Sequence, residues 1–363
     1  MTKLILVGGF LGSGKTTLLT EAAKLLSAEG KAVGLITNDQ APDLVDTRLL
    51  SRVGKGVAEV SGSCFCCNFN GFVEAVKSLI AQGAETIIAE PVGSCTDLSA
   101  TIMNPLKKFH PEWSIAPLTV LVAPNRFLEI LGKTPSQVEP DAIYIMKLQM
   151  DEADLILVNK TDSLSEEKRS EIKTLLSENF SSKPTGLISA KTGEGVVQWL
   201  AEIQAAPPPQ AGASIVPVDY DRYANGEAVL GWLNATASIT KKEQNIEISS
   251  ILKLIMTALQ EKLRQVGAEI GHIKAVLHLD GKEGAANLTS INGDIDVREV
   301  APKTDVPTLI FNARVQMPPE ELEKIVRGLL TTAAVEQLDI QIQSLRCLMP
   351  GRPVPTHRFT ESV

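Results

Sequence analysis

The segment Gly9–Thr16 has the residue types and spacing of a phosphate-binding loop, G-x-x-x-x-G-K-T. Its glycines allow the backbone to curve around an anion, Lys15 supplies a positive charge for the β- and γ-phosphates, and the Thr16 hydroxyl can bind Mg²⁺. The loop follows the apolar run Leu4–Val7 and precedes a predicted helix, whose positive end would face the phosphates. The sequence therefore predicts a nucleoside triphosphate site. The nucleotide contacts expected here are Gly9, Gly12, Ser13, Gly14, Lys15, Thr16 and Thr17.

A second motif, N-K-x-D, follows the apolar run Leu155–Val158. The Asp162 carboxylate can accept two hydrogen bonds from the N–H edge of guanine, a pair of donors that adenine lacks. Lys160 can lay its stem across the base, and Asn159 can tie this loop to the phosphate-binding loop. The next predicted strand ends in a tripeptide that resembles the loop behind the guanine carbonyl in GTPases, namely Ser189, Ala190 and Lys191. The predicted nucleotide is therefore GTP.

Residues with the chemistry for hydrolysis stand at the end of another apolar strand. Glu90 can hold the Mg²⁺ shell or orient the attacking water, and the Gly93 N–H can reach the γ-phosphate. Asp39 ends a further strand and is a candidate Mg²⁺ ligand, with Asp43 and Asp46 as alternatives in the same stretch. The predicted catalytic residues are Lys15, Thr16, Glu90 and Gly93, and the predicted Mg²⁺ ligands are Thr16, Asp39 and Glu90.

Three of the five cysteines stand within four residues, at Cys64, Cys66 and Cys67. An odd total with this clustering is a poor disulfide framework and indicates metal binding instead. In an extended segment Cys64 and Cys66 point to the same side, whereas Cys67 points away unless the chain turns. Thiolates favour Zn²⁺, Cu⁺ and related ions. We predict a metal site at these three residues; the alternative, a redox pair, lacks the usual C-x-x-C spacing.

Two or three thiolates do not complete a tetrahedral site. Cys95 is expected at the same edge of the sheet, where a lone thiol is favoured over a further ligand of the cluster; His110 and Asp46 are other candidate donors. Cys347 and His357 lie in a C-terminal stretch rich in Gly, Pro and Arg. This stretch has too few ligands for a metal site of its own, and we expect it to dock on a domain or partner.

Strand-like and helix-like segments alternate over residues 1–205, with helices expected at 15–29, 70–82 and 146–152 among others. This alternation predicts a P-loop, mainly parallel, three-layer α/β sheet, in which ligands bind at the carboxyl ends of the strands. A Pro-rich linker is predicted at 206–216. The order of strand-like and helix-like segments in residues 217–363 indicates two β-α-β units with a hairpin between them. This order predicts a smaller α+β ferredoxin-like domain.

The chain has 363 residues, 35 Lys and Arg against 43 Asp and Glu, and a formal net charge of −8. No long basic run is present, so neither nucleic acid nor an anionic membrane surface is an expected partner. The apolar run at the N-terminus is too short for a signal peptide, and no stretch has the length of a membrane span. We therefore expect a cytoplasmic protein.

The motifs Gly9–Thr17, Cys64–Cys67, Glu90–Gly93 and Asn159–Asp162 occur in the order found in one GTPase family. Over roughly residues 1–205 the chain resembles the CobW-type, or cobalamin synthesis protein-like, metallochaperone GTPases, which are related to the UreG and HypB nickel-insertion GTPases. The resemblance implies Mg²⁺-dependent GTP hydrolysis coupled to binding of Zn²⁺ or Co²⁺ and its delivery to a target. The implied partner is a client metalloprotein or corrinoid protein. The resemblance does not decide whether the protein forms a homodimer.

The chain departs from that family pattern in three ways. Asn38–Ala41 stands where Asn-Glu-Phe-Gly is usual, and the chain has only four His in place of a His-rich tract. The C-terminal region has the size of the family's second domain but only loose similarity to it. One alternative function is a GTP-dependent activator or assembly factor for a corrinoid-dependent methyltransferase or mutase, without metal transfer. Another is an ATP-using small-molecule kinase, which would contradict the prediction for Asp162.

Overall fold

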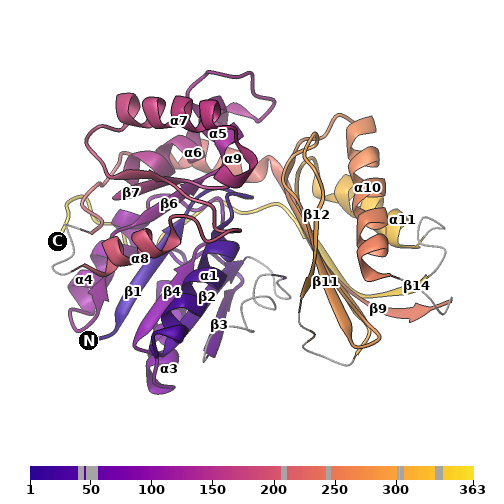
Figure 1. Ribbon diagram of the computed structural model, residues 1–363, viewed down its shortest axis with the longest axis horizontal. Helices are drawn as coiled ribbons and strands as arrows, with labels where there is room; N and C mark the ends of the chain where they lie inside the picture. The colour runs from indigo at the N-terminus through magenta and orange to yellow at the C-terminus, as the bar shows by residue number, and fades with distance from the viewer. Residues whose placement is uncertain are drawn as a thin grey trace. The chain divides into compact units, whose positions relative to one another are not determined.

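The computed structural model describes residues 1–39, 45, 56–205, 211–242, 247–300, 302, 306–331 and 338–363. The chain divides into two compact units. Unit 1 comprises Met1–Gln40, Leu49–Tyr223 and Arg352–Val363, and unit 2 comprises Ala224–Gly351 with Ala41–Arg48, of which only Val45 is described. The predicted ranges 1–205, 206–216 and 217–363 do not coincide with these units, and Ala41–Arg48 is one difference. Unit 2 begins later, at Ala224, and the C-terminal segment Arg352–Val363 returns to unit 1 (Figure 1).

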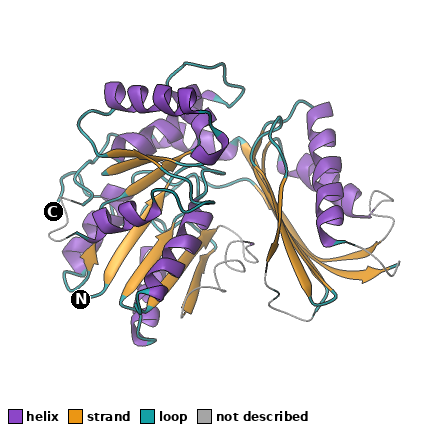
Figure 2. Ribbon diagram, viewed as in Figure 1, coloured by secondary structure: helices purple, strands orange, loops and turns teal. Residues whose placement is uncertain are grey.

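Unit 1 is built on one sheet in which every strand pair is parallel, as predicted, with the strand order β3-β2-β4-β1-β6-β7-β8 and the short β5 paired to β1. Helices cover both faces of this sheet (Figure 2). The strands are β1 Lys3–Gly8, β2 Val33–Asp39, β3 Gly56–Ser61, β4 Thr86–Glu90, β5 Ser114–Ile115, β6 Thr119–Val122, β7 Leu155–Val158 and β8 Thr185–Leu187.

The helices of unit 1 lie between these strands in the chain. They are α1 Lys15–Ala28, α3 Phe69–Ala81, a π-helix at Ser99–Met103, α4 Asn104–Phe109, α5 Pro124–Ile130, α6 Pro140–Glu152, a 3₁₀ turn at Thr161–Ser163, α7 Glu166–Asn179, α8 Val196–Gln204 and α9 Tyr220–Ala228, which crosses into unit 2. Strand β1 is central, so its apolar run Leu4–Val7 is buried on both faces.

Helices α6 and α5 are among those that differ from the sequence prediction. Helix α6 begins at Pro140, not at residue 146, because Glu139 caps it by accepting hydrogen bonds from the backbone N–H groups of Asp141 and Ala142. Pro140 occupies the first turn, where a missing N–H costs nothing. Helix α5 was not predicted; it is short and also starts with a proline, Pro124.

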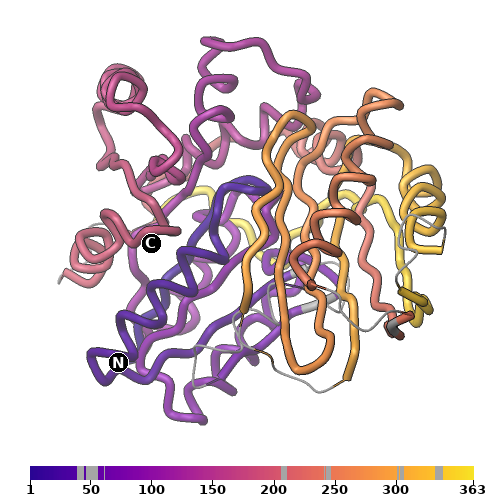
Figure 3. Tube along the Cα trace, turned by 45° about the vertical axis from the view of Figure 1, so that its right-hand side comes forward, coloured from indigo at the N-terminus to yellow at the C-terminus, as the bar shows by residue number. Residues whose placement is uncertain are grey.

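Unit 2 is an antiparallel sheet in the order β12-β11-β10-β13-β9-β14. Its elements are β9 Leu230–Lys241, α10 Ile248–Gln265, β10 Ile270–Leu279, β11 Lys282–Leu288, β12 Asp296–Val300, β13 Thr308–Gln316, α11 Pro319–Thr331 and β14 Leu338–Leu348. Two β-α-β units place both helices on one face (Figure 3). The ferredoxin-like prediction is confirmed, with β12 as an unpredicted strand at the edge.

In the described part of the chain, no helix combines the length and the apolar character needed to cross a bilayer.

Candidate functional site

The loop between β1 and α1 depends on two glycines. Gly9 has φ +127°, and a Cβ there would lie 2.2 Å from the carbonyl oxygen of Leu121. Gly14 has φ +98°, and a Cβ there would lie 2.2 Å from Asn159 Nδ2. Any side chain would therefore be both strained and in collision with a neighbour. The phosphate-binding loop packs closely against β6 on one side and the N-K-x-D loop on the other.

Lys15, Thr16 and Glu90 converge at the carboxyl edge of the sheet. Lys15 Nζ donates to the carbonyl oxygens of Gly9 at 2.7 Å and Phe10 at 3.2 Å, and lies 3.9 Å from Glu90 Oε1. The Thr16 hydroxyl donates to the Glu90 carboxylate, with oxygens at 3.0 and 3.2 Å. All three side chains are buried. An ammonium, a hydroxyl and a carboxylate thus meet where Mg²⁺ and the phosphates are expected.

Two further predicted residues lie beside the same loop. The Ser13 hydroxyl is buried and has no hydrogen-bond partner among the described residues, so it fits a ligand that brings an acceptor. A Cβ on Gly93 would lie 2.6 Å from Leu11 Cδ2 and 3.1 Å from Leu11 N. The backbone of Gly93 therefore packs directly on the phosphate-binding loop, whose remaining members Gly12 and Thr17 lie in the loop and in the first turn of α1.

Asn159 joins the three predicted nucleotide loops. Its Nδ2 donates to the carbonyl oxygen of Ser13 at 2.8 Å, which confirms the predicted tie to the phosphate-binding loop. Its Oδ1 accepts from the backbone N–H of Ala190 at 2.9 Å. The Asp162 carboxylate accepts from the Ser189 hydroxyl at 2.7 Å. The carboxylate predicted to read guanine is therefore held beside the S-A-K loop, which ends with Lys191.

Lys160 has a backbone conformation that few non-glycine residues adopt. Its φ is +64°, in the left-handed region, directly before the 3₁₀ turn Thr161–Ser163. The Thr161 hydroxyl donates to the carbonyl oxygen of Ile188 at 2.9 Å and ties this turn to the end of β8. Strain of this kind persists only where surrounding contacts maintain it.

The three clustered cysteines come together at one point. Cys64 Sγ lies 2.8 Å from Cys66 Sγ and 3.1 Å from Cys67 Sγ, and the latter two sulfurs are 3.8 Å apart. Cys67 does not point away, because the chain turns: its N–H donates to the carbonyl oxygen of Cys64 at 3.1 Å. All three thiols are free. Their sulfur atoms form a group that can hold one metal ion.

Asn38, at the end of β2, positions the cysteine loop and was not among the predicted site residues. Its Nδ2 donates to the carbonyl oxygens of Val60 at 2.8 Å and Ser63 at 2.7 Å. Its Oδ1 accepts from the N–H of Phe65 at 2.9 Å. These bonds hold the backbone on both sides of Cys64. The sequence shows that Asn38 stands at the end of a predicted strand, but only the fold shows which backbone groups it binds.

The cysteine sulfurs share hydrogen bonds that separate their pKa values. Side-chain hydrogen bonds with Cys66, then Cys67, then Cys95 lower the pKa of Cys64 well below the usual range. The same contacts, chiefly with Cys64, raise the pKa of Cys66 and raise the pKa of Cys67 to about 11. These contacts favour the charged form at Cys64 and the protonated form at Cys66 and Cys67. A divalent cation would replace those protons and be held by several thiolates.

The other proposed metal donors differ in their positions. The His110 ring stacks on Trp113, with centroids 4.3 Å apart, and its Nδ1 lies 3.1 Å from Glu112 Oε1. The side chain of Asp39, and Asp43 and Asp46 as whole residues, lie outside the described part of the chain.

The C-terminal segment docks on unit 1, which agrees with the prediction of an ordered, docked tail. The N–H of Thr356 donates to the carbonyl oxygen of Cys66 at 2.8 Å, and the N–H of Val354 donates to Cys67 Sγ at 3.3 Å. The His357 ring packs edge-on against Phe69, with centroids 5.0 Å apart. The segment therefore covers the cysteine loop and supplies one of its sulfurs with a hydrogen bond.

Comparison with known proteins adds a family match. Residues 3–185, slightly more than half of the chain, match the family described as CobW/HypB/UreG, nucleotide-binding domain. A zinc chaperone CobW from Sinorhizobium sp is 28% identical, over 52% of this chain and 58% of that protein. A zinc chaperone YeiR from Escherichia coli (strain K12) is 26% identical, over 49% of this chain and 52% of that protein. The chain spans about half the length of the curated relatives it matches.

Solved structures with similar folds include GTPases and metal-binding proteins. The Zn(II)-bound YjiA GTPase from E. coli is 16% identical, covers 90% of this chain and 98% of its own, and has a TM-score of 0.34. HypB from Helicobacter pylori in complex with nickel is 18% identical, covers 55% of this chain and 83% of its own, and has a TM-score of 0.40.

Proposed function

The chain belongs to the CobW/HypB/UreG family, and from this premise we propose that it is a GTP-hydrolysing metallochaperone that binds a transition metal through Cys64, Cys66 and Cys67. The metal is Zn²⁺ or Co²⁺, since both accept thiolate ligands in tetrahedral geometry. Names given to relatives support the metal-handling part of this proposal, because they include zinc chaperones and a zinc-regulated GTPase metalloprotein activator from Dictyostelium discoideum.

One observation carries the proposal: β2 lies between β3, which leads into the cysteine loop, and β4, which ends at the predicted Mg²⁺ ligand Glu90. Asn38, which holds the loop around Cys64, follows Thr37 in β2, and Thr37 is paired with Glu90 in β4. Glu90 in turn accepts the hydrogen bond from Thr16. A single chain of short contacts therefore joins the two sites, and a change at the phosphates can alter the cysteine loop.

The nucleotide site supports GTP as the nucleotide. Asp162 would accept the guanine N–H groups, while the phosphate-binding loop and the buried Ser13 hydroxyl would hold the phosphates. Mg²⁺ would be held by Thr16 and Glu90, with Asp39 as the further ligand proposed from the sequence, and would neutralise charge on the β- and γ-phosphates. In hydrolysis, Glu90 would orient water, and Lys15 and the Gly93 N–H would stabilise the transferred phosphoryl group.

Delivery to a client metalloprotein follows from the same arrangement. A chaperone must hold its ion and then give it up, and GTP turnover supplies the change of state between these two tasks. The client is a metalloprotein or corrinoid protein. If the partner instead formed a stable complex without receiving metal, the protein would be an assembly factor for a corrinoid-dependent enzyme.

GTP hydrolysis by the full chain, with Mg²⁺ and with or without one equivalent of Zn²⁺ or Co²⁺, tests the coupling. We expect the metal to change the wild-type turnover several-fold and to leave the Cys64→Ser/Cys66→Ser/Cys67→Ser variant unaffected. Cys347→Ser is the matched control, because Cys347 lies on β14 in unit 2 and should respond as the wild type does. Equal metal responses in the wild type and the triple variant would refute the coupling.

A further inference from the structure

Cys95 joins the three clustered cysteines from a different segment of the chain. It lies in the loop after β4 and is buried, and its thiol contributes both to the lowered pKa of Cys64 and to the raised pKa of Cys66. Resting on the proposed metal-binding function, we propose that Cys95 is a fourth ligand of the cysteine site and the ligand through which the nucleotide acts on the metal. Unit 1 would then hold a closed site of four thiolates.

A tight turn places the Cys95 thiol. The N–H of Cys95 donates to the carbonyl oxygen of Val92 at 2.9 Å, which closes the turn. The buried Gln149 of α6 donates from Nε2 to the carbonyl oxygens of Gly93 at 3.0 Å and Cys95 at 2.8 Å. The turn is thus fixed to a helix at two of its carbonyl oxygens. Such support preorganises a ligand before the metal arrives.

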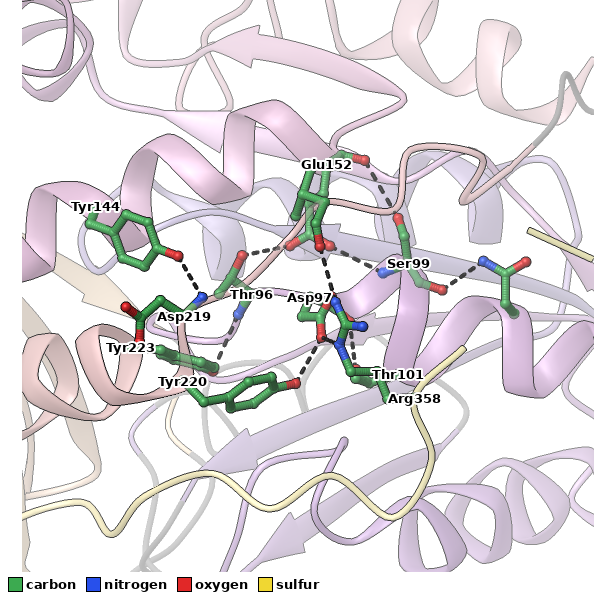
Figure 4. A network of polar contacts seen from close by, with 12 residues as sticks. Thr96, Asp97, Ser99, Thr101, Tyr144, Glu152, Asp219, Tyr220, Tyr223 and Arg358 are labelled. Carbon is green, nitrogen blue, oxygen red and sulfur yellow. Dashed lines mark hydrogen bonds and ion pairs between the residues drawn. The ribbon is translucent and has the colours of Figure 1, made fainter. Parts of the chain in front are cut away.

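The residues after Cys95 are equally well held, as Figure 4 shows. The Thr96 hydroxyl donates to Glu152 Oε1 at 2.9 Å. The Asp97 carboxylate accepts from the Tyr220 hydroxyl at 2.7 Å and from Arg358 Nε at 2.7 Å. Asp97 also has φ +64°, a conformation that these contacts maintain. Contacts of the residues before and after Cys95 in the chain therefore fix the position of its backbone.

The C-terminal segment connects the two cysteine-bearing loops. Val354 and Thr356 bind Cys67 and Cys66, respectively, through the hydrogen bonds described above. Two residues further on, Arg358 forms its ion pair with Asp97, beside Cys95. One short stretch of chain therefore binds both loops.

The number of thiolates decides what such a site can do. Four thiolates make a closed tetrahedral site that holds its ion, whereas three leave a position that another protein's ligand can enter. Cys95 stands two residues after Gly93, whose backbone packs on Leu11 of the phosphate-binding loop. A nucleotide that shifts Gly93 must shift the turn that carries Cys95. Loss of Cys95 alone would convert the closed site into the open one.

X-ray absorption on the zinc-loaded full chain tests the ligand set without a variant. We expect four sulfur neighbours at about 2.3 Å. Three sulfurs with one oxygen or nitrogen neighbour would overturn the four-thiolate site. If zinc does not bind to sulfur at all, the proposed function fails together with this inference, so the two failures are distinguishable.

Co²⁺ titration gives a second measurement, because the sulfur-to-cobalt charge-transfer absorption follows the number of Co–S bonds. Cys95→Ser should lose about a quarter of this absorption, and Cys347→Ser should lose none. An unchanged spectrum for Cys95→Ser would overturn the inference while leaving the three-cysteine site intact.

The nucleotide dependence is tested by the Zn²⁺ affinity of the full chain with GDP and with a non-hydrolysable GTP analogue, measured by competition with a chelator. We expect the wild type and Cys347→Ser to show a difference of about tenfold between the two nucleotides, and Cys95→Ser to show little or none. A wild-type difference that persists in full in Cys95→Ser would refute the role of Cys95 in coupling, as would the absence of any difference in the wild type.

Discussion

The nucleotide-binding edge and the cysteine site use the same strand ends but are assembled in different ways. Phosphate binding relies on backbone N–H groups of one continuous loop, Gly9–Thr16, so its residues are neighbours in sequence. The proposed metal site takes its four thiols from two loops, and the segment that contacts both loops begins at Arg352. The difference shows that a backbone-based site can be recognised from a local motif, whereas a side-chain-based site is completed by distant segments.

The largest effect that would sharpen this comparison is expected at the nucleotide site. Asp162→Asn should weaken GTP binding about a hundredfold or more, because two charge-assisted hydrogen bonds are each worth about 1.5–3 kcal/mol. Binding of xanthosine triphosphate should improve, since its base has an acceptor where guanine has a donor. Zn²⁺ affinity should stay near the wild-type value.

Nucleotide affinities measured by calorimetry or with fluorescent analogues would check this prediction. Asp141→Asn is the control, since Asp141 is an acid on α6 that pairs with Arg222, away from the N-K-x-D loop. Unaltered GTP affinity in Asp162→Asn would contradict the assignment of the guanine site.

An intermediate effect is expected from Asn38, on the cysteine side of the comparison. Asn38→Ala removes the side chain that holds the loop around Cys64, and should lower Zn²⁺ affinity about 10- to 100-fold. GTP affinity should change far less. Chelator competition and nucleotide titration of the same preparation would measure both. Asn179→Ala, which removes only a bond to the end of α7, should match the wild type in both; an equally tight zinc site in Asn38→Ala would contradict the prediction.

The smallest effect concerns stability beneath the Cys95 loop. Burial, reinforced by the charge of Asp97, raises the pKa of Glu152 to about 8. The folded state therefore keeps this proton at pH values where the unfolded chain has lost it. Between about pH 5 and 8 stability should fall with rising pH, by at most about 1.4 kcal/mol per unit from this group.

Glu152→Gln should remove that part of the slope, because the amide does not titrate. Urea unfolding at several pH values would measure it, with Glu178→Gln on the exposed face of α7 as the control. A slope identical to that of the wild type would show that Glu152 ionises normally. The nucleotide affinity of Glu152→Gln should equal that of the wild type, because Glu152 lies beneath the Cys95 loop and not at the nucleotide-binding edge.

Much of the fold follows from local sequence. The apolar runs that became β1 and β7 are buried on both faces, as continuous Val, Ile and Leu runs predict. Helices α5 and α9 were missed because short helices carry little periodicity. The sequence does not decide whether the chain turns to bring Cys67 to Cys64, since residue types do not reveal the backbone hydrogen bond between them.

By itself, the sequence determined the phosphate-binding loop, the N-K-x-D loop and the cluster of three thiols, because each depends on residues that are close together in the chain. Only the tertiary structure decided that Asn38 holds Cys64, that Cys95 meets the cluster, and that Arg358 joins the two cysteine loops. The physical reason is that thiols and ion pairs act through side chains over a few ångströms. Their partners are set by how strands and loops pack, which spacing along the chain does not record.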